Sequence, residues 1–77
     1  MDRTTNPLTK EQEALRGRAI KDMSDDQLRL WIDACERMER WVAFAKARRM
    51  WKRSHQAAVE EMALREDRRA KRTAAAS

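Results

Sequence analysis

One cysteine and one histidine, Cys35 and His55, are the side chains of this 77-residue chain best suited to nucleophilic catalysis. A Cys-His pair requires hydrogen-bond contact, whereas an unbroken helix between these two positions would hold them about 30 Å apart. Zinc sites combine several Cys or His ligands at short spacing, and no second Cys or His occurs. We therefore expect no enzyme, no metal and no other cofactor. Cys35 is interpreted as a small apolar residue and His55 as the edge of an apolar stripe.

Interaction chemistry is concentrated between residues 44 and 55, FAKARRMWKRSH. This basic cluster contains five cations and no carboxylate: Lys46, Arg48, Arg49, Lys52 and Arg53. Phe44 and Trp51 lie among these cations, and Trp and Arg are frequent anchors of protein interfaces. We predict that the segment, with His55 at its end, binds a partner. Phe44 and Trp51 would be apolar anchors, and the cations would select an acidic surface.

Nucleic acid is the alternative partner for the same cations. Clustered Lys and Arg release counterions from phosphates, and an aromatic ring can stack on an unpaired base. A second basic block at residues 68–72 would add to such a surface. The spacing matches no helix-turn-helix, basic-zipper or RNA-motif signature. The third reading is a solvated helix face without a partner.

Composition sets the fold class and the compartment. The chain has one Gly, one Pro and a net charge of +5, and such Gly- and Pro-poor, charged sequences favour long helices. Basic blocks at 46–53 and 68–77 flank an acidic block at 54–67. Neither a signal peptide nor a membrane span is indicated, and an unpaired Cys suits a reducing compartment. We expect an all-α, cytoplasmic protein without a membrane partner or a small-molecule substrate.

A capping box formed by Thr9 and Gln12 predicts the start of a first helix. We expect this helix over residues 8–22, after a flexible arm at 1–7. Gly17 falls inside it, where glycine costs about 1 kcal/mol relative to Ala. Either the weak point is tolerated, or a large side chain of the facing helix approaches closely.

A second capping box, Ser24 with Gln27, predicts the start of a long helix over residues 25–72, followed by a frayed tail at 73–77. No Gly or Pro interrupts this segment. The alternative is a break near residues 53–54, with Ser54 capping a third helix.

Two apolar stripes follow from the helical period of this long segment. Angles around the helix are counted from Leu28 at about 100° per residue. The first stripe lies between roughly 220° and 340° and comprises Trp31, Ala34, Cys35, Met38, Trp41, Val42 and Ala45. The second is centred near 170° and comprises Phe44, Trp51, His55, Ala58 and Met62. The first helix would reach only to about residue 41 when folded back, which leaves apolar surface uncovered. We therefore predict one domain: an antiparallel hairpin of a short first and a long second helix, forming a dimer or bundle. The predicted oligomer seam comprises Trp31, Cys35, Met38, Trp41, Val42, Ala58 and Met62.

Small charged helical chains without catalytic groups are typical of accessory regulators and inhibitors, including those of phages and mobile elements. The sequence thus predicts a non-catalytic, coiled-coil-like interaction module. Its expected partners are a second copy of the chain and a larger acidic protein, with nucleic acid as the alternative to the latter.

Overall fold

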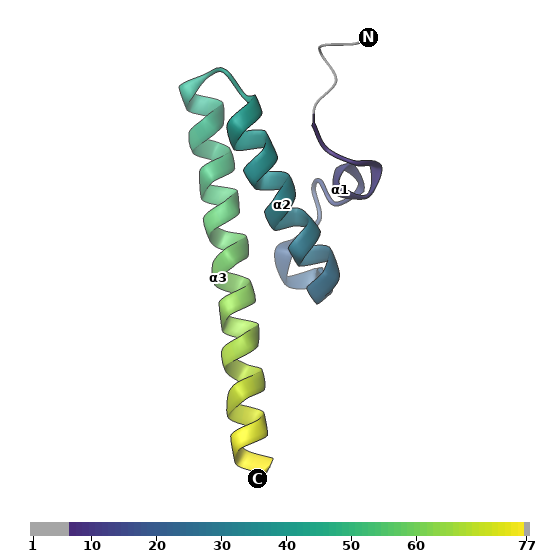
Figure 1. The fold of residues 1–77 in the computed structure, drawn as a ribbon, viewed down its shortest axis with the longest axis vertical. Coiled ribbons are helices and arrows are strands. Elements are labelled where there is room, and N and C mark those ends of the chain that lie inside the picture. Colours follow the sequence, from purple (N-terminus) through teal and green to yellow (C-terminus); the bar gives the residue numbers. More distant parts are fainter. Residues whose placement is uncertain (1–6, 77) are drawn as a thin grey trace.

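The computed structural model describes residues 7–76, and all regular structure within them is helical. The elements are α1 (Lys10–Ala14), the 3-10 turn η1 (Ile20–Asp22), α2 (Asp25–Trp41) and α3 (Ala45–Ala76). Figure 1 shows α2 and α3 side by side and running in opposite directions, with α1 beside α2. The last turns of α3 extend past the start of α2. The prediction of an all-helical fold with a long helix packed on another is confirmed.

Both predicted capping boxes are present. Gln12 N–H donates to Thr9 Oγ1 at 3.1 Å, and Thr9 N–H donates to Gln12 Oε1 at 3.0 Å. Ser24 and Gln27 repeat this exchange at 3.1 and 2.9 Å. Each box satisfies two backbone donors that a helix start leaves free, so the local sequence determines where α1 and α2 begin.

The first helix is much shorter than the predicted 8–22, because α1 ends at Ala14. Gly17 has a φ of +82°, in the left-handed region that residues with a Cβ rarely adopt. No atom lies within 4 Å of the place that a Cβ would occupy. Both interpretations of Gly17 as a residue inside a helix were therefore wrong: it lies in the turn that follows α1.

The second helix also differs from the predicted 25–72. It is interrupted at residues 42–44, where Val42 is extended with φ −69° and ψ 138°. From Ala45, α3 then continues through the alternative break site at 53–54 and through most of the tail predicted to fray. The interruption lets the two apolar stripes pack against each other. This packing removes apolar surface from water, which favours the folded-back arrangement of α2 and α3.

The core lies mainly between α2 and α3. Leu28, Ala34 and Cys35 on α2 and Ala58 on α3 have no exposed surface. The side chain of Ala58 is a single methyl group, so α3 can approach α2 closely at this point. The core is completed by residues from every segment: Leu15, Met23 and Trp31, with Leu8, Ile20, Ile32, Trp51 and Met62 packed around them.

A buried glutamine fixes α1 to α2. Besides its capping bond, Gln12 donates through Nε2 to the Leu30 carbonyl at 3.1 Å and to Asp33 Oδ2 at 2.8 Å. These contacts use both amide protons and the carbonyl of Gln12. The predicted arm at 1–7 lies outside the described residues except for Pro7, whose carbonyl accepts a hydrogen bond from Arg37 Nη1 at 3.3 Å.

Candidate functional site

The turn between α2 and α3 is made without Gly or Pro. Val42 N–H still donates to the Met38 carbonyl at 2.9 Å, which closes the last turn of α2. Arg48 Nη2 then donates to the Val42 carbonyl at 3.1 Å, and Arg48 N–H donates to the Phe44 carbonyl at 3.0 Å. One arginine of the basic cluster therefore stabilises the turn, through both its backbone and its side chain.

Large apolar side chains are exposed around this turn. We define the tip as residues 41–44, in which Phe44 is 78% exposed and Trp41 is 45% exposed. Met50, on the next turn of α3, is 64% exposed. Single exposed apolar residues are ordinary, but a group of large ones at one end of a small molecule indicates a contact surface.

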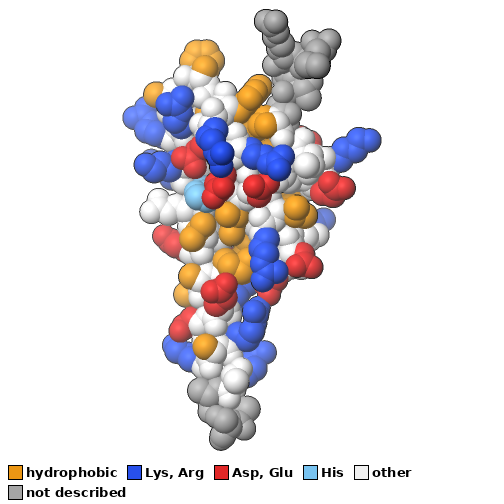
Figure 2. All heavy atoms as spheres, in the orientation of Figure 1, with side chains coloured by type: hydrophobic (Ala, Val, Ile, Leu, Met, Phe, Trp, Pro, Cys, Tyr) orange, Lys and Arg blue, Asp and Glu red, His pale blue; other side chains and the backbone are white. Residues whose placement is uncertain are grey.

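Cations surround the tip. Lys46, Arg49, Lys52 and Arg53 are exposed, and none of the ion pairs among the described residues involves them. In Figure 2, Lys and Arg side chains gather at the end of the hairpin where α2 and α3 join. A shallow depression of about 290 Å³ lies among Lys46, Arg49, Met50 and Arg53. The charges of the basic cluster are thus directed to solvent.

Trp51 is not the free anchor that the sequence predicted. Its ring packs on Trp31 at 5.8 Å between centroids, with the planes tilted by 54°. On another side, the Arg16 guanidinium carbon lies 5.6 Å from the centre of the Trp51 ring. Trp51 is half-buried and joins three segments of the fold, so Phe44 is the exposed anchor at this end.

His55 also points back to α2. Its Nε2 lies 3.4 Å from Glu36 Oε1, and its Nδ1 lies 3.6 Å from Glu39 Oε2. Glu36 and Glu39 line a depression of about 410 Å³ with Arg40 and Arg48. Because the chain folds back at 42–44, the separation of about 30 Å between Cys35 and His55 that was predicted for an unbroken helix does not apply. The place of His55 is beside two carboxylates rather than on a partner surface.

The cysteine is poorly suited to nucleophilic chemistry in this fold. Cys35 is fully buried, and this burial raises the pKa of its thiol to about 12, with the Glu39 carboxylate acting in the same direction. The thiol therefore stays protonated at neutral pH, and the thiolate is the nucleophilic form.

Most of the predicted oligomer seam is used inside the chain. Trp31, Cys35, Met38 and Ala58 are buried, and Met62 packs against the same core. Val42 is half-buried in the turn, and Trp41 keeps an exposed ring at the tip. The buried members of the predicted seam are therefore not available for a contact between copies, because they pack between α2 and α3, whereas Trp41 keeps exposed surface.

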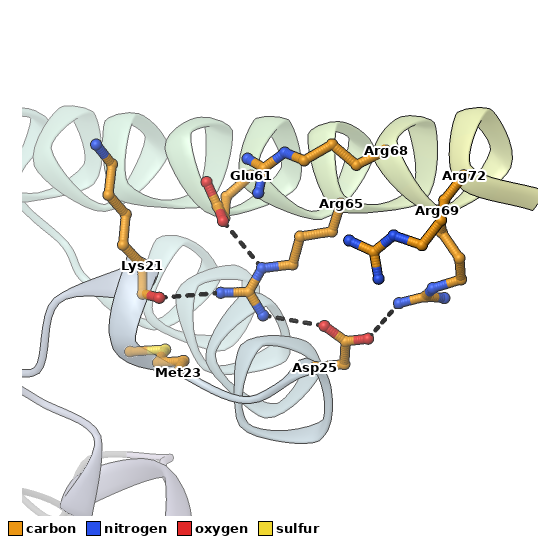
Figure 3. A pocket seen from close by; sticks show the side chains of 8 residues that line it. All are labelled: Lys21, Met23, Asp25, Glu61, Arg65, Arg68, Arg69 and Arg72. Atoms are coloured by element: carbon orange, nitrogen blue, oxygen red, sulfur yellow. Dashed lines mark hydrogen bonds and ion pairs between the residues drawn. The ribbon is translucent and has the colours of Figure 1, made fainter. Parts of the chain in front are cut away.

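The opposite end of the hairpin contains a charged cluster that sequence reasoning missed. Arg65, whose side chain is only 14% exposed, donates to Glu61 Oε2 at 2.9 Å and to Asp25 Oδ1 at 3.0 Å. It also donates to the carbonyls of Ile20 at 3.1 Å and Lys21 at 3.4 Å. Figure 3 shows its guanidinium between α3 and the start of α2. The i,i+4 spacing of Glu61 and Arg65 was visible in the sequence, but the contact with Asp25 spans 40 residues.

Asp25 is bound by two arginines, since Arg69 Nη2 contacts its other carboxylate oxygen. The hydrogen bond from Arg65 is the main reason that the pKa of Asp25 lies below its ordinary value, against a partial opposing effect of burial. Lys21, Arg68 and Arg72 border a hollow of about 420 Å³ beside this cluster. No ion pair among the described residues involves these three.

No protein-family model matches this chain, and no curated protein or solved structure is detectably similar to it. Within residues 7–76, no group of three or more His, Cys, Asp or Glu side chains is arranged to hold a metal ion. No helix in the same range is both long enough and apolar enough to cross a membrane.

Proposed function

We propose that this chain is a non-catalytic interaction module that regulates or inhibits a larger protein by docking the tip of its hairpin onto an acidic surface. The observation that carries the proposal is the 78% exposure of Phe44 among cations that form no ion pair with the described residues. Neither the exposed Phe44 ring nor the unpaired cations around it stabilise the folded chain by themselves. Both would contribute to binding if an apolar pocket ringed by carboxylates covered them.

The tip has a firm support for such docking. Trp51, Trp31 and Arg16 pack directly behind the basic cluster, and Arg48 ties down the turn. A rigid support lowers the entropy lost on binding. In this proposal Phe44, Trp41 and Met50 supply the apolar contact, while Lys46, Arg49, Lys52 and Arg53 supply charge complementarity and speed the encounter.

Self-association through the buried part of the predicted seam is not part of this proposal, because Trp31, Cys35, Met38 and Ala58 pack inside the chain. A contact between copies would use exposed surface instead.

Binding to nucleic acid is a second candidate, favoured by the hollow at the other end of the hairpin. Lys21, Arg68 and Arg72 border it and form no ion pair within residues 7–76, and clustered cations of this kind attract phosphates. Trp51 gives this candidate no help, because a ring packed on Trp31 and covered by Arg16 is not free to stack on a base.

Affinity capture from the native host separates the two candidates. The wild-type chain, Phe44→Ser, Arg49→Glu and the double variant Arg68→Glu/Arg72→Glu would be compared with and without nuclease. Val59→Ser is the matched control, since Val59 is an exposed apolar residue of α3 away from the tip.

We expect a protein that survives nuclease and is retained equally by the wild type, Val59→Ser and the double variant. Phe44→Ser and Arg49→Glu should each reduce its capture at least about tenfold. Equal capture by Phe44→Ser would contradict the docking proposal. Loss on nuclease treatment, together with loss in the double variant, would establish the nucleic-acid candidate instead.

A further inference from the structure

One flank of α3, rotated by about 100° from the residues that face α2, carries an apolar stripe with heptad spacing. Met50 is 64% exposed and Leu64 is 53% exposed, with the exposed Ala57 midway between them. Residues seven apart return to nearly the same side of a helix. The side that faces α2 is a different one, marked by Trp51, Ala58 and Met62. The stripe is therefore an unpartnered helix face.

Four charged residues run along one edge of this stripe at the same spacing. In chain order they are two cations and two anions: Lys46, Arg53, Glu60 and Asp67. All four are exposed. Of these, only Asp67 has an ion pair among the described residues, an exposed contact with Lys71 at 3.1 Å. The sign of the charge changes between Arg53 and Glu60, where Ala57 is the central residue of the stripe.

From this arrangement we infer that two copies of the chain associate by packing α3 antiparallel against α3 along this stripe. A twofold axis beside Ala57 places Met50 of one copy opposite Leu64 of the other. The same axis places the charged edge of one copy beside the charged edge of the other, with the two edges running antiparallel. Lys46 then lies beside Asp67 of the second copy, and Arg53 beside Glu60.

The order of the charges is what identifies the occupant as a second copy. A parallel pair would place Lys46 beside Lys46 and Asp67 beside Asp67, which is destabilising. An antiparallel pair forms four complementary contacts from one sequence, as an isologous interface requires. Ala57 at the centre allows the two helices to approach closely. The apolar area is small, so the dimer is weak and sensitive to salt.

This inference does not rest on the proposed function, because the stripe and the tip are different surfaces, although Lys46, Met50 and Arg53 belong to the proposed contacts of both. It also differs from the seam predicted from sequence, none of whose residues takes part.

Charge reversal tests the inference through two variants. Lys46→Glu/Arg53→Glu makes the whole edge acidic, and Glu60→Lys/Asp67→Lys makes it basic. Arg18→Glu/Lys52→Glu is the control for the first variant, because it changes net charge equally at exposed cations away from the stripe. Sedimentation velocity from micromolar to millimolar protein would measure association, and circular dichroism would check that each variant is folded.

We expect concentration-dependent dimers for the wild type and the control, and monomers for each edge variant alone. An equimolar mixture of the two edge variants should form a heterodimer at least about tenfold tighter than a mixture of the basic variant with the control. A wild type that stays monomeric at millimolar concentration would overturn the inference. Edge variants that dimerise like the wild type, or a mixture no tighter than its control, would do the same.

Discussion

The two ends of the hairpin use charge in opposite ways. At the start of α2, Arg65 is bound by two carboxylates and two backbone carbonyls. Around the tip, Lys46, Arg49 and Lys52 contact no carboxylate among the described residues, and Phe44 lies exposed within it. Charges that are satisfied within a fold contribute to holding it together, whereas unsatisfied charges beside exposed apolar surface remain for a partner. The comparison assigns stability to one end and binding to the other.

Removing Arg65 should have the largest effect on stability. Arg65→Met leaves Glu61 without its partner and Asp25 with only Arg69, and it removes one hydrogen-bond donor from each of two carbonyls. Lys52→Met is the matched control on the same helix and should change the free energy of unfolding by less than about 0.5 kcal/mol. Urea unfolding followed by circular dichroism would measure both. Equal stability of the two variants would show that the Arg65 cluster does not hold the fold.

Gln12 tests the attachment of α1. Gln12→Ala removes three hydrogen bonds, and we expect it to cost about 1–3 kcal/mol of unfolding free energy. Gln12→Glu should cost more, because a carboxylate would face Asp33 and the Leu30 carbonyl without a proton to donate. Gln27→Glu is the control, since Glu serves equally well in a capping box. The same urea measurement applies, and a Gln12→Glu variant as stable as Gln27→Glu would contradict the buried contacts.

Substitution of Gly17 should change the free energy of unfolding by a smaller amount, through backbone conformation alone. Gly17→Ala should destabilise by about 1 kcal/mol because of the left-handed conformation alone, since a Cβ would meet no atom. Gly17→Asn should recover part of this loss, because Asn tolerates that conformation better. Thermal unfolding of the two variants would check the order, and an Ala variant as stable as the wild type would show that the chain need not turn here.

Acid should weaken the Arg65 end selectively. The pKa of Asp25 is lowered in the folded chain, so its contribution is fully present above the carboxyl pKa of the unfolded chain. That contribution is lost as the pH falls through the acidic range between the unfolded pKa and the lower folded pKa. Asp25→Asn should therefore show a shallower loss of stability in this range than the wild type. Asp26→Asn, which changes the adjacent exposed carboxylate, should keep the wild-type slope.

Local signals were enough to predict part of the fold. The composition predicted the helical class, and the two capping boxes located the starts of α1 and α2, because such contacts join residues three apart. The interruption at residues 42–44 contains no Gly or Pro, yet the sequence carried a trace of it. The two apolar stripes differ in direction by about 110° on one continuous helix, and a helix that turns back brings them together.

The candidate site was predicted only in part. Phe44 and the cations lie at the surface, and the exposed side chain of Phe44 follows from its place in the turn. Trp51 and His55 could not be placed correctly, because their contacts with Trp31, Glu36 and Glu39 exist only once α3 folds back. The Arg65 cluster was missed for the same reason: Asp25 lies 40 residues away in sequence.

The central claim, that the tip is for binding and the other end for stability, is tested most directly by Phe44→Ser. Its thermal unfolding midpoint and its capture of the partner protein would be measured on the same preparation. We predict an unfolding midpoint close to that of the wild type, because Phe44 is 78% exposed, together with at least about tenfold weaker capture. A variant with a clearly lower unfolding midpoint than the wild type, or one that captures the partner as well as the wild type, would contradict the account.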